Sequence, residues 1–232
     1  MPYAALVLDG LIEALGLRTI VFSAWGLREG LLYETLDRDE RPVDPLIAGC
    51  AALGGRQGLS PGLPAALQAW LADVIAALPV SFDSRRDPVL AAAACRLADL
   101  GARLHPDHRV DLVFDQVLRA PIPGQTHAER AWLAAALSAR YGGAVTTPAP
   151  ELIERLLPEE ARLAARAMGL ALRLGCDLSG RSPQLLANAW IKVEGGSLRL
   201  SAAPGYAGVL LGEQTRRRAK ALAESLALKL EI

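Results

Sequence analysis

The sequence has few aromatic residues and no net charge. Aromatic side chains make up 5% of its 232 residues, while 52% of the residues are hydrophobic, with Ala and Leu dominant. This composition predicts a mainly helical chain with a sizeable core. Twenty-five basic residues balance 25 acidic ones. The chain as a whole therefore has no electrostatic attraction for nucleic acid or membranes, and any anion site must be a local cluster.

Cysteine is scarce, and membrane-type segments are missing. Cys50, Cys95 and Cys176 lie far apart without a C-x-x-C pair, which indicates small core residues in a reducing cytosol. No apolar run reaches the ~18 to 20 residues of a membrane span. The start of the chain carries Asp9 and lacks the basic segment of a signal peptide. We therefore expect a cytoplasmic protein that does not enter the membrane.

Common catalytic motifs are also missing. The glycines between Gly54 and Gly62 are not followed by the lysine of a phosphate-binding loop, and there is no G-x-S-x-G motif. The segment H-P-D-H, from His105 to His108, has the residue types of a metal site. Pro106 and the expected helix start limit how far these side chains can converge. We expect surface capping there, and no metal site.

The first 40 residues predict a helix, a strand and a second helix. The first helix covers residues 3–15. The strand covers Thr19 to Phe22 and stops at Ser23, Gly26 allows a turn, and helical periodicity follows from Leu27 to Leu36. The charged segment after it, residues 37–45, contains proline and predicts a domain boundary.

The middle of the chain predicts a bundle of five helices. They are expected at residues 45–53, 61–79, 89–104, 107–119 and 126–141. The pairs Asp44-Pro45 and Asp87-Pro88 are typical helix starts, with aspartate as the cap. Thr126 and Glu129 have the spacing of a capping box. Short links between successive helices are typical of an all-α bundle.

The last third predicts a small α+β subdomain. Helices are expected at residues 150–157 and 159–174. Residues 189–201 alternate as in a β-hairpin, with the turn at Gly195-Gly196. A final helix from Glu213 to Leu230 is expected to point Leu222, Leu226 and Leu230 inward. The expected domains are residues 1–40, 41–146 and 147–232.

Three segments resemble the exopolyphosphatase and guanosine pentaphosphate phosphohydrolase family. Residues 26–33, G-L-R-E-G-L-L-Y, resemble the corner that closes its second actin-like domain. Residues 95–101, C-R-L-A-D-L-G, are similar to the His-Asp helix of the family's HD-type helical domain. Residues 139–142, A-R-Y-G, are similar to an R-Y-H segment that follows in that domain. Ala98 and Gly142 stand where that pattern has histidines, and neither can bind a metal. Asp99 is kept, as a capping, ion-pairing or functional residue.

The resemblance implies a fold and a function. The fold would be mainly α: a degenerate HD-like bundle between the strand-helix end of an actin-like domain and a small α+β subdomain. The family's catalytic D-x-G-S loop and glutamate belong to preceding domains and are absent here. We therefore expect a catalytically inactive, homodimeric portion that binds polyphosphate or guanosine pentaphosphate. Magnesium would belong to the parent enzyme, with no cofactor in this chain.

Arginine clusters are the candidate phosphate-binding residues, because the planar guanidinium donates two bonds to an oxyanion at once. The candidates are Arg28, Arg103, His105, His108, Arg109, Arg130 and Arg140. The segment from Arg103 to Arg109 is preferred, because it holds four potential cations and Asp107 is its only acidic residue. The alternative for every cluster is a solvated face paired with nearby acids, and for Arg28 a structural pair with Glu29.

A different class of function remains open. The chain could be a stand-alone, degenerate HD-like module that senses a nucleotide or binds a protein partner. RNA binding by the C-terminal hairpin and the arginines that follow it is disfavoured by the neutral charge and the few aromatic residues.

Overall fold

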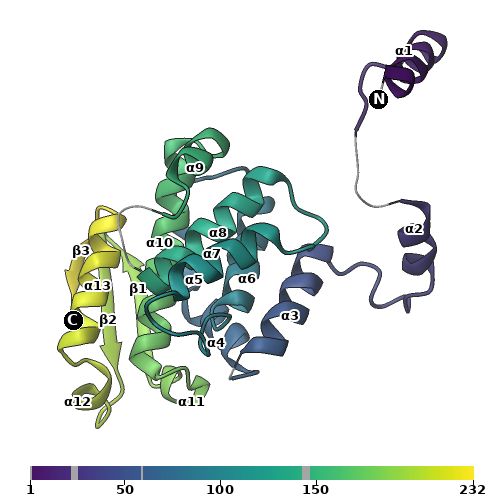
Figure 1. The fold of residues 1–232 in the computed structure, drawn as a ribbon. Helices are drawn as coiled ribbons and strands as arrows, with labels where there is room; N and C mark the ends of the chain where they lie inside the picture. Colours follow the sequence, from purple (N-terminus) through teal and green to yellow (C-terminus); the bar gives the residue numbers. More distant parts are fainter. Residues whose placement is uncertain (1, 22–25, 59, 143–146) are drawn as a thin grey trace. The chain divides into compact units, whose positions relative to one another are not determined.

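The computed structural model describes residues 2–21, 26–58, 60–142 and 147–232 (Figure 1). It contains two compact units, residues 1–43 and residues 44–232, and each is described by itself.

The first unit contains two short helices, α1 (Pro2–Leu15) and α2 (Leu27–Glu34). The carboxylate of Glu29 accepts the backbone N–H of Gly26 at 2.8 Å, which fixes the start of α2. Arg41 donates to the carbonyl of Glu34 at the end of α2. The strand expected from Thr19 is not present in its described part, because residues 19–21 have no regular structure. Residue 22, the last of that expected strand, lies outside the described residues.

The second unit is built around a central helix. Its helical part comprises α3 (Pro45–Gln57), α4 (Leu63–Trp70), α5 (Ala72–Ala76), α6 (Arg86–Leu97), α7 (Arg109–Arg119), α8 (His127–Gly142), α9 (Pro150–Leu156), α10 (Glu159–Ser179) and α11 (Pro183–Leu186). Residues 131–140 of α8 are all buried. A helix that is apolar on every side must lie inside the molecule, and α8 packs against α6, α7, α9 and α10.

The expected helices are present, with shifted ends. The second one divides at Leu71 into α4 and α5. The helix expected at residues 89–104 begins earlier, at Arg86, because the carboxylate of Asp83 accepts the N–H groups of Arg85 and Arg86, and it ends at Leu97. Asp87 is therefore not the cap. Its carboxylate instead accepts the N–H groups of residues 81 and 82.

Two other expected helix starts are confirmed. Asp44 caps α3 through the N–H of Leu46 at 2.8 Å. Thr126 and Glu129 form the capping box, with N–H groups donating in both directions at 2.6 and 3.2 Å. The helix expected over residues 107–119 begins only at Arg109.

The end of the chain forms a three-stranded sheet in the order β1 (Ala189–Glu194), β2 (Ser197–Ala202), β3 (Lys229–Glu231), with α12 (Ala207–Leu210) and α13 (Glu213–Ser225) between β2 and β3. The hairpin is confirmed, and Gly195 and Gly196 both have positive φ in its turn, which suits glycine. The final helix expected to reach Leu230 is wrong in its last part. The chain reverses at Ala227, where φ is 54°, and Leu230 pairs in parallel with Leu198 of β2.

One hydrophobic core runs from α3 to α13. Helix α10 contacts α8 on one side and α13 on another. The limits expected at residues 40 and 146 stay predictions.

Candidate anion-binding site

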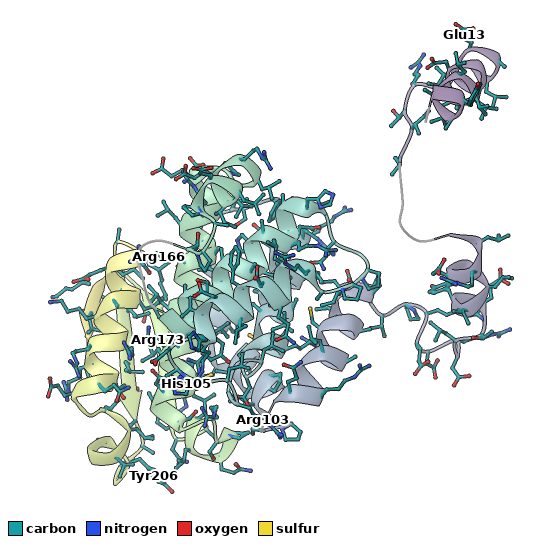
Figure 2. The ribbon with its side chains drawn as sticks, in the orientation of Figure 1. Glu13, Arg103, His105, Arg166, Arg173 and Tyr206 are labelled. Atoms are coloured by element: carbon teal, nitrogen blue, oxygen red, sulfur yellow. The ribbon has the colours of Figure 1, made fainter. Side chains whose placement is uncertain are left out.

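A row of arginines follows one face of α10. Arg162, Arg166, Arg173 and the acidic residue Asp177 stand at positions i, i+4, i+11 and i+15. With 3.6 residues per turn, this spacing places all four side chains along one side of the helix. Figure 2 shows Arg166 and Arg173 following each other along α10, on the side where α13 packs. This set, Arg162, Arg166, Arg173 and Asp177, is called the α10 stripe below.

Arginines from two other helices reach the end of the stripe. Arg140, near the end of α8, approaches Asp177 with 3.6 Å between Nη1 and Oδ1. Arg218 of α13 approaches the other carboxylate oxygen with 3.2 Å between Nε and Oδ2, and Arg173 lies 3.8 Å from the same oxygen. Three guanidinium groups from three helices thus share one carboxylate. This arginine triad, Arg140, Arg173 and Arg218, keeps an excess of positive charge.

The close packing of α8 on α10 brings the triad together. A Cβ atom on Gly169 would lie 2.2 Å from the carbonyl oxygen of Ala136 and 2.6 Å from Cβ of Ala139. Only glycine allows the two backbones to approach so closely. Arg140 comes one residue after Ala139, so its side chain is held 6% exposed beside α10.

The surroundings act differently on two arginines of the triad. Burial disfavours the charge of Arg140, but Cys176, Tyr141 and Asp177 outweigh burial, so the pKa of Arg140 is raised. Burial lowers the pKa of Arg173, and the neighbouring Arg218 lowers it further, while Asp177 acts in the opposite direction. Burial raises the pKa of the Cys176 thiol, and the guanidinium of Arg140 opposes this shift. Incompletely neutralised cations of this kind are stabilised by an added anion.

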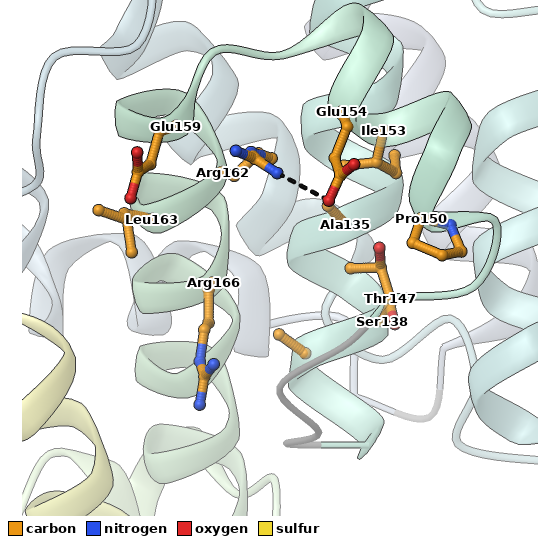
Figure 3. Close-up of a pocket in the computed structure, with 11 residues that line it drawn as sticks. Ala135, Ser138, Thr147, Pro150, Ile153, Glu154, Glu159, Arg162, Leu163 and Arg166 are labelled. Carbon is orange, nitrogen blue, oxygen red and sulfur yellow. Dashed lines mark ion pairs between the residues drawn. The ribbon is translucent and has the colours of Figure 1, made fainter.

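A pocket of about 300 Å³ lies at the other end of the stripe, between α8, α9 and α10 (Figure 3). Its wall includes Ala135, Ile153 and Leu163. Arg162 reaches across it to Glu154, with 3.2 Å between the charged atoms. Arg166, one turn further along α10, also lines it. Arg166 forms no ion pair with any residue that the structure describes.

A comparison with protein families identifies the second unit. The sequence model described as exopolyphosphatase, C-terminal, matches residues 56–232, which includes the α10 stripe and the whole triad. The chain belongs to the exopolyphosphatase C-terminal family. A comparison with curated proteins gave no match.

Arg28 lies outside the part matched by the exopolyphosphatase family. It is 86% exposed and pairs with the adjacent Glu29 at 2.8 Å, which was the structural alternative for this residue.

The preferred cluster before α7 is only partly assembled in this exopolyphosphatase domain. Arg103, His105 and His108 are exposed. The two histidine rings lie 6.1 Å apart, and His105 approaches Asp107 at 3.7 Å. The side chain of His108, at the N-cap position of α7, makes no capping hydrogen bond, so capping by His108 is wrong.

The remaining predicted arginines mostly serve the structure. Arg109 turns back and donates to the carbonyl of Leu104 at 2.7 Å. Its guanidinium lies 5.5 Å from the ring of Tyr141, and that of Arg140 lies 4.8 Å from the same ring. Arg130 donates to the carbonyl of Ala120 at 2.9 Å, at the end of α7. Arg130 and Arg140 therefore serve opposite ends of α8.

The position compared with the HD dyad is not helical. Helix α6 ends at Leu97, so Asp99 lies in the turn after it. Asp99 is 6% exposed and approaches Arg181 with 3.6 Å between charged atoms. Among the described residues, no three His, Cys, Asp or Glu side chains are placed to hold a metal ion. None of the described helices has the length and apolar character needed to cross a membrane.

Sequence reasoning missed Arg162, Arg166, Arg173 and Asp177 as site residues, and it considered Arg218 only as one of the arginines at the start of the last helix. The one-sided spacing of the arginines within the long α10 was the available signal. No sequence signal placed Arg218 beside α10, because α10 and α13 are far apart in the sequence.

Proposed function

We propose that this exopolyphosphatase C-terminal region binds polyphosphate along the α10 stripe and the arginine triad. In this proposal the chain is the polyanion-binding and dimerisation portion of an exopolyphosphatase-type phosphohydrolase. One observation carries the proposal: Arg140, Arg173 and Arg218 approach a single carboxylate within 3.2–3.8 Å.

The length of the stripe suits a polymer. Arg166 and Arg173 are separated by seven residues, or about 10 Å along a helix. A chain of phosphates can contact both arginines while each binds a different phosphate. Partly buried arginines bind oxyanions more strongly than exposed ones, because water screens them less.

Titration with polyphosphate at low and high salt tests the proposal. The double variant Arg173→Gln with Arg218→Gln should bind at least tenfold more weakly, since each charge-assisted contact contributes about 1.5–3 kcal/mol. Arg217→Gln is the matched control, because Arg217 neighbours Arg218 on α13 but is 72% exposed and faces Glu213. Unchanged binding by the double variant would exclude the triad as the site.

The same titration decides between the two candidate clusters. Arg103→Gln with His108→Gln removes an exposed arginine and an exposed histidine of the sequence-predicted cluster. We expect less than a twofold change in polyphosphate affinity from this pair. A larger loss than that of the triad variant would move the site to the segment before α7.

The proposal has two further, separate parts: the chain does not catalyse hydrolysis, and it forms a dimer. Both follow from the family resemblance, in which the catalytic loop and glutamate belong to preceding domains and magnesium to the parent enzyme. We expect no sustained release of phosphate from polyphosphate by this chain with magnesium, and a dimer in light scattering. Sustained turnover would contradict the first part, and a monomer at every concentration the second.

The pocket beside α10 favours nucleotide binding as a second candidate function. Its apolar wall could hold a base, while Arg166 and the rest of the stripe bind phosphates, as in guanosine pentaphosphate. Competition separates the two functions. If polyphosphate without a base displaces bound guanosine nucleotide, but Leu163→Asp weakens only the nucleotide, the pocket holds a base.

A further inference from the structure

The carboxylate of Asp177 occupies the point where the arginine triad meets. Its contact with Arg218, at 3.2 Å, is a hydrogen bond. The approaches of Arg140 at 3.6 Å and Arg173 at 3.8 Å are too long for one. The carboxylate therefore offsets part of the positive charge of the triad. Most guanidinium N–H groups of the triad do not donate a hydrogen bond to it.

A carboxylate is a close chemical match for one unit of polyphosphate. An internal phosphate of the polymer presents two charged, non-bridging oxygens, as a carboxylate does. A terminal phosphate presents three oxygens and more charge. The bidentate geometry that arginine forms with carboxylates is also the one it forms with phosphates. A phosphate and Asp177 would thus compete for the same donors.

The side chain of Asp177 is placed so that it can leave these donors. It is 24% exposed, whereas Arg140 is 6% exposed and Arg173 is 16% exposed. A rotamer change can turn this short side chain toward water, while the two arginines stay held by their surroundings. Moving the Asp177 carboxylate away from the arginines costs free energy. An anion that can bind only after this movement therefore binds more weakly by the same free energy.

We propose that Asp177 is an internal competitor for phosphate, which makes the triad bind polyphosphate weakly and release it quickly. This inference rests on the proposed function. A polymer that must move past a site benefits from contacts that break easily. Asp177 would thus set how long each phosphate stays.

The variant Asp177→Asn tests the inference, because it keeps the shape of the side chain and removes its charge. Polyphosphate should bind about tenfold more tightly, chiefly through slower dissociation. Asp177→Glu keeps the charge and should retain the fast dissociation of the unchanged protein. Asp115→Asn is the matched control, since Asp115 forms an exposed helical pair with Arg119 on α7. It should leave both affinity and dissociation rate unchanged.

Thermal unfolding gives a second, independent measurement. Without ligand, Asp177→Asn should unfold at a lower temperature, because three cations lose their carboxylate. Inorganic tripolyphosphate should raise its unfolding temperature more than that of the unchanged protein. If the variant does not fold alone, folding restored by tripolyphosphate supports the inference, and no restoration contradicts it.

The outcomes separate this inference from the proposed function. If the Arg173 and Arg218 variant loses binding while Asp177→Asn binds equally or more weakly, Asp177 only positions the arginines and the inference is wrong. Equal tightening by Asp177→Glu would also overturn it. If the arginine variant binds normally, the proposed function itself fails.

Discussion

The cluster before α7 and the arginine triad both gather basic side chains, but their surroundings differ. Arg103, His105 and His108 are close in sequence and exposed to water. The triad comes from α8, α10 and α13, and the Arg140 and Arg173 side chains are 6% and 16% exposed. Exposed cations near each other in sequence are cheap to form and weak as anion sites. Cations that tertiary packing brings together cost free energy to bury side by side, and a bound anion offsets that free energy.

The largest expected effect comes from separating α8 and α10. Gly169→Leu would place a Cβ atom 2.2 Å from the Ala136 carbonyl oxygen. We expect a loss of at least ~3 kcal/mol in the free energy of unfolding, measured with denaturant, together with loss of polyphosphate binding. Gly55→Ala is the control, because a Cβ atom there meets nothing within 4 Å. Stable, normally binding Gly169→Leu protein would show that the triad does not depend on this crossing.

Thiol reactivity measures how well the core beside the triad is closed. Burial raises the pKa of Cys95 to about 12 and also raises the pKa of Cys176, which lies next to Arg140. For Cys95, a shift from 9.0 to about 12 reduces the thiolate fraction roughly a thousandfold at neutral pH. We expect disulfide reagents to label neither thiol until the protein unfolds. Rapid labelling in the native state would mean that water reaches the triad freely.

A single-arginine comparison tests the contrast directly. Arg140→Gln should weaken polyphosphate binding about tenfold and reduce the slope of log affinity against log salt by about one. Arg103→Gln should change affinity less than twofold. Titrations over a series of salt concentrations measure both quantities. Equal effects of the two substitutions would remove the distinction between packed and exposed cations.

The smallest expected effect concerns a third charged group, at the C-terminal sheet. The Arg199 side chain holds the pKa of Glu231 below its usual 4.5, and Ser197 adds to this. Because the folded-state pKa is lowered, this contribution to stability is complete above pH 4.5 and is lost as the pH falls through the lower, folded-state value.

The variant Glu231→Gln measures that contribution. It should unfold at a slightly lower temperature than the unchanged protein near neutral pH, and the difference should disappear in acid. The effect should be small because the pair is exposed. A difference that grows as the pH falls would contradict the sign of the pKa shift.

Local signals predicted most of the elements. Asp44 and the Thr126–Glu129 pair mark real helix starts, and Gly195-Gly196 marks the real hairpin turn, because these signals act within a few residues. Leu230 was placed in a helix because its spacing from Leu226 is helical. Its actual pairing with Leu198 is decided by contacts across the sheet, which periodicity does not record.

The amino-acid sequence by itself determined a mainly helical chain without net charge, its hairpin and its likeness to the exopolyphosphatase family. The spacing of hydrophobic residues, helix caps and glycine turns depends only on residues that are close together in the sequence. Only the tertiary structure decided which arginines share an acid. Arg140, Asp177 and Arg218 meet because α8 and α13 both pack on α10, and the free energy that holds them there comes from the core, not from their own charges.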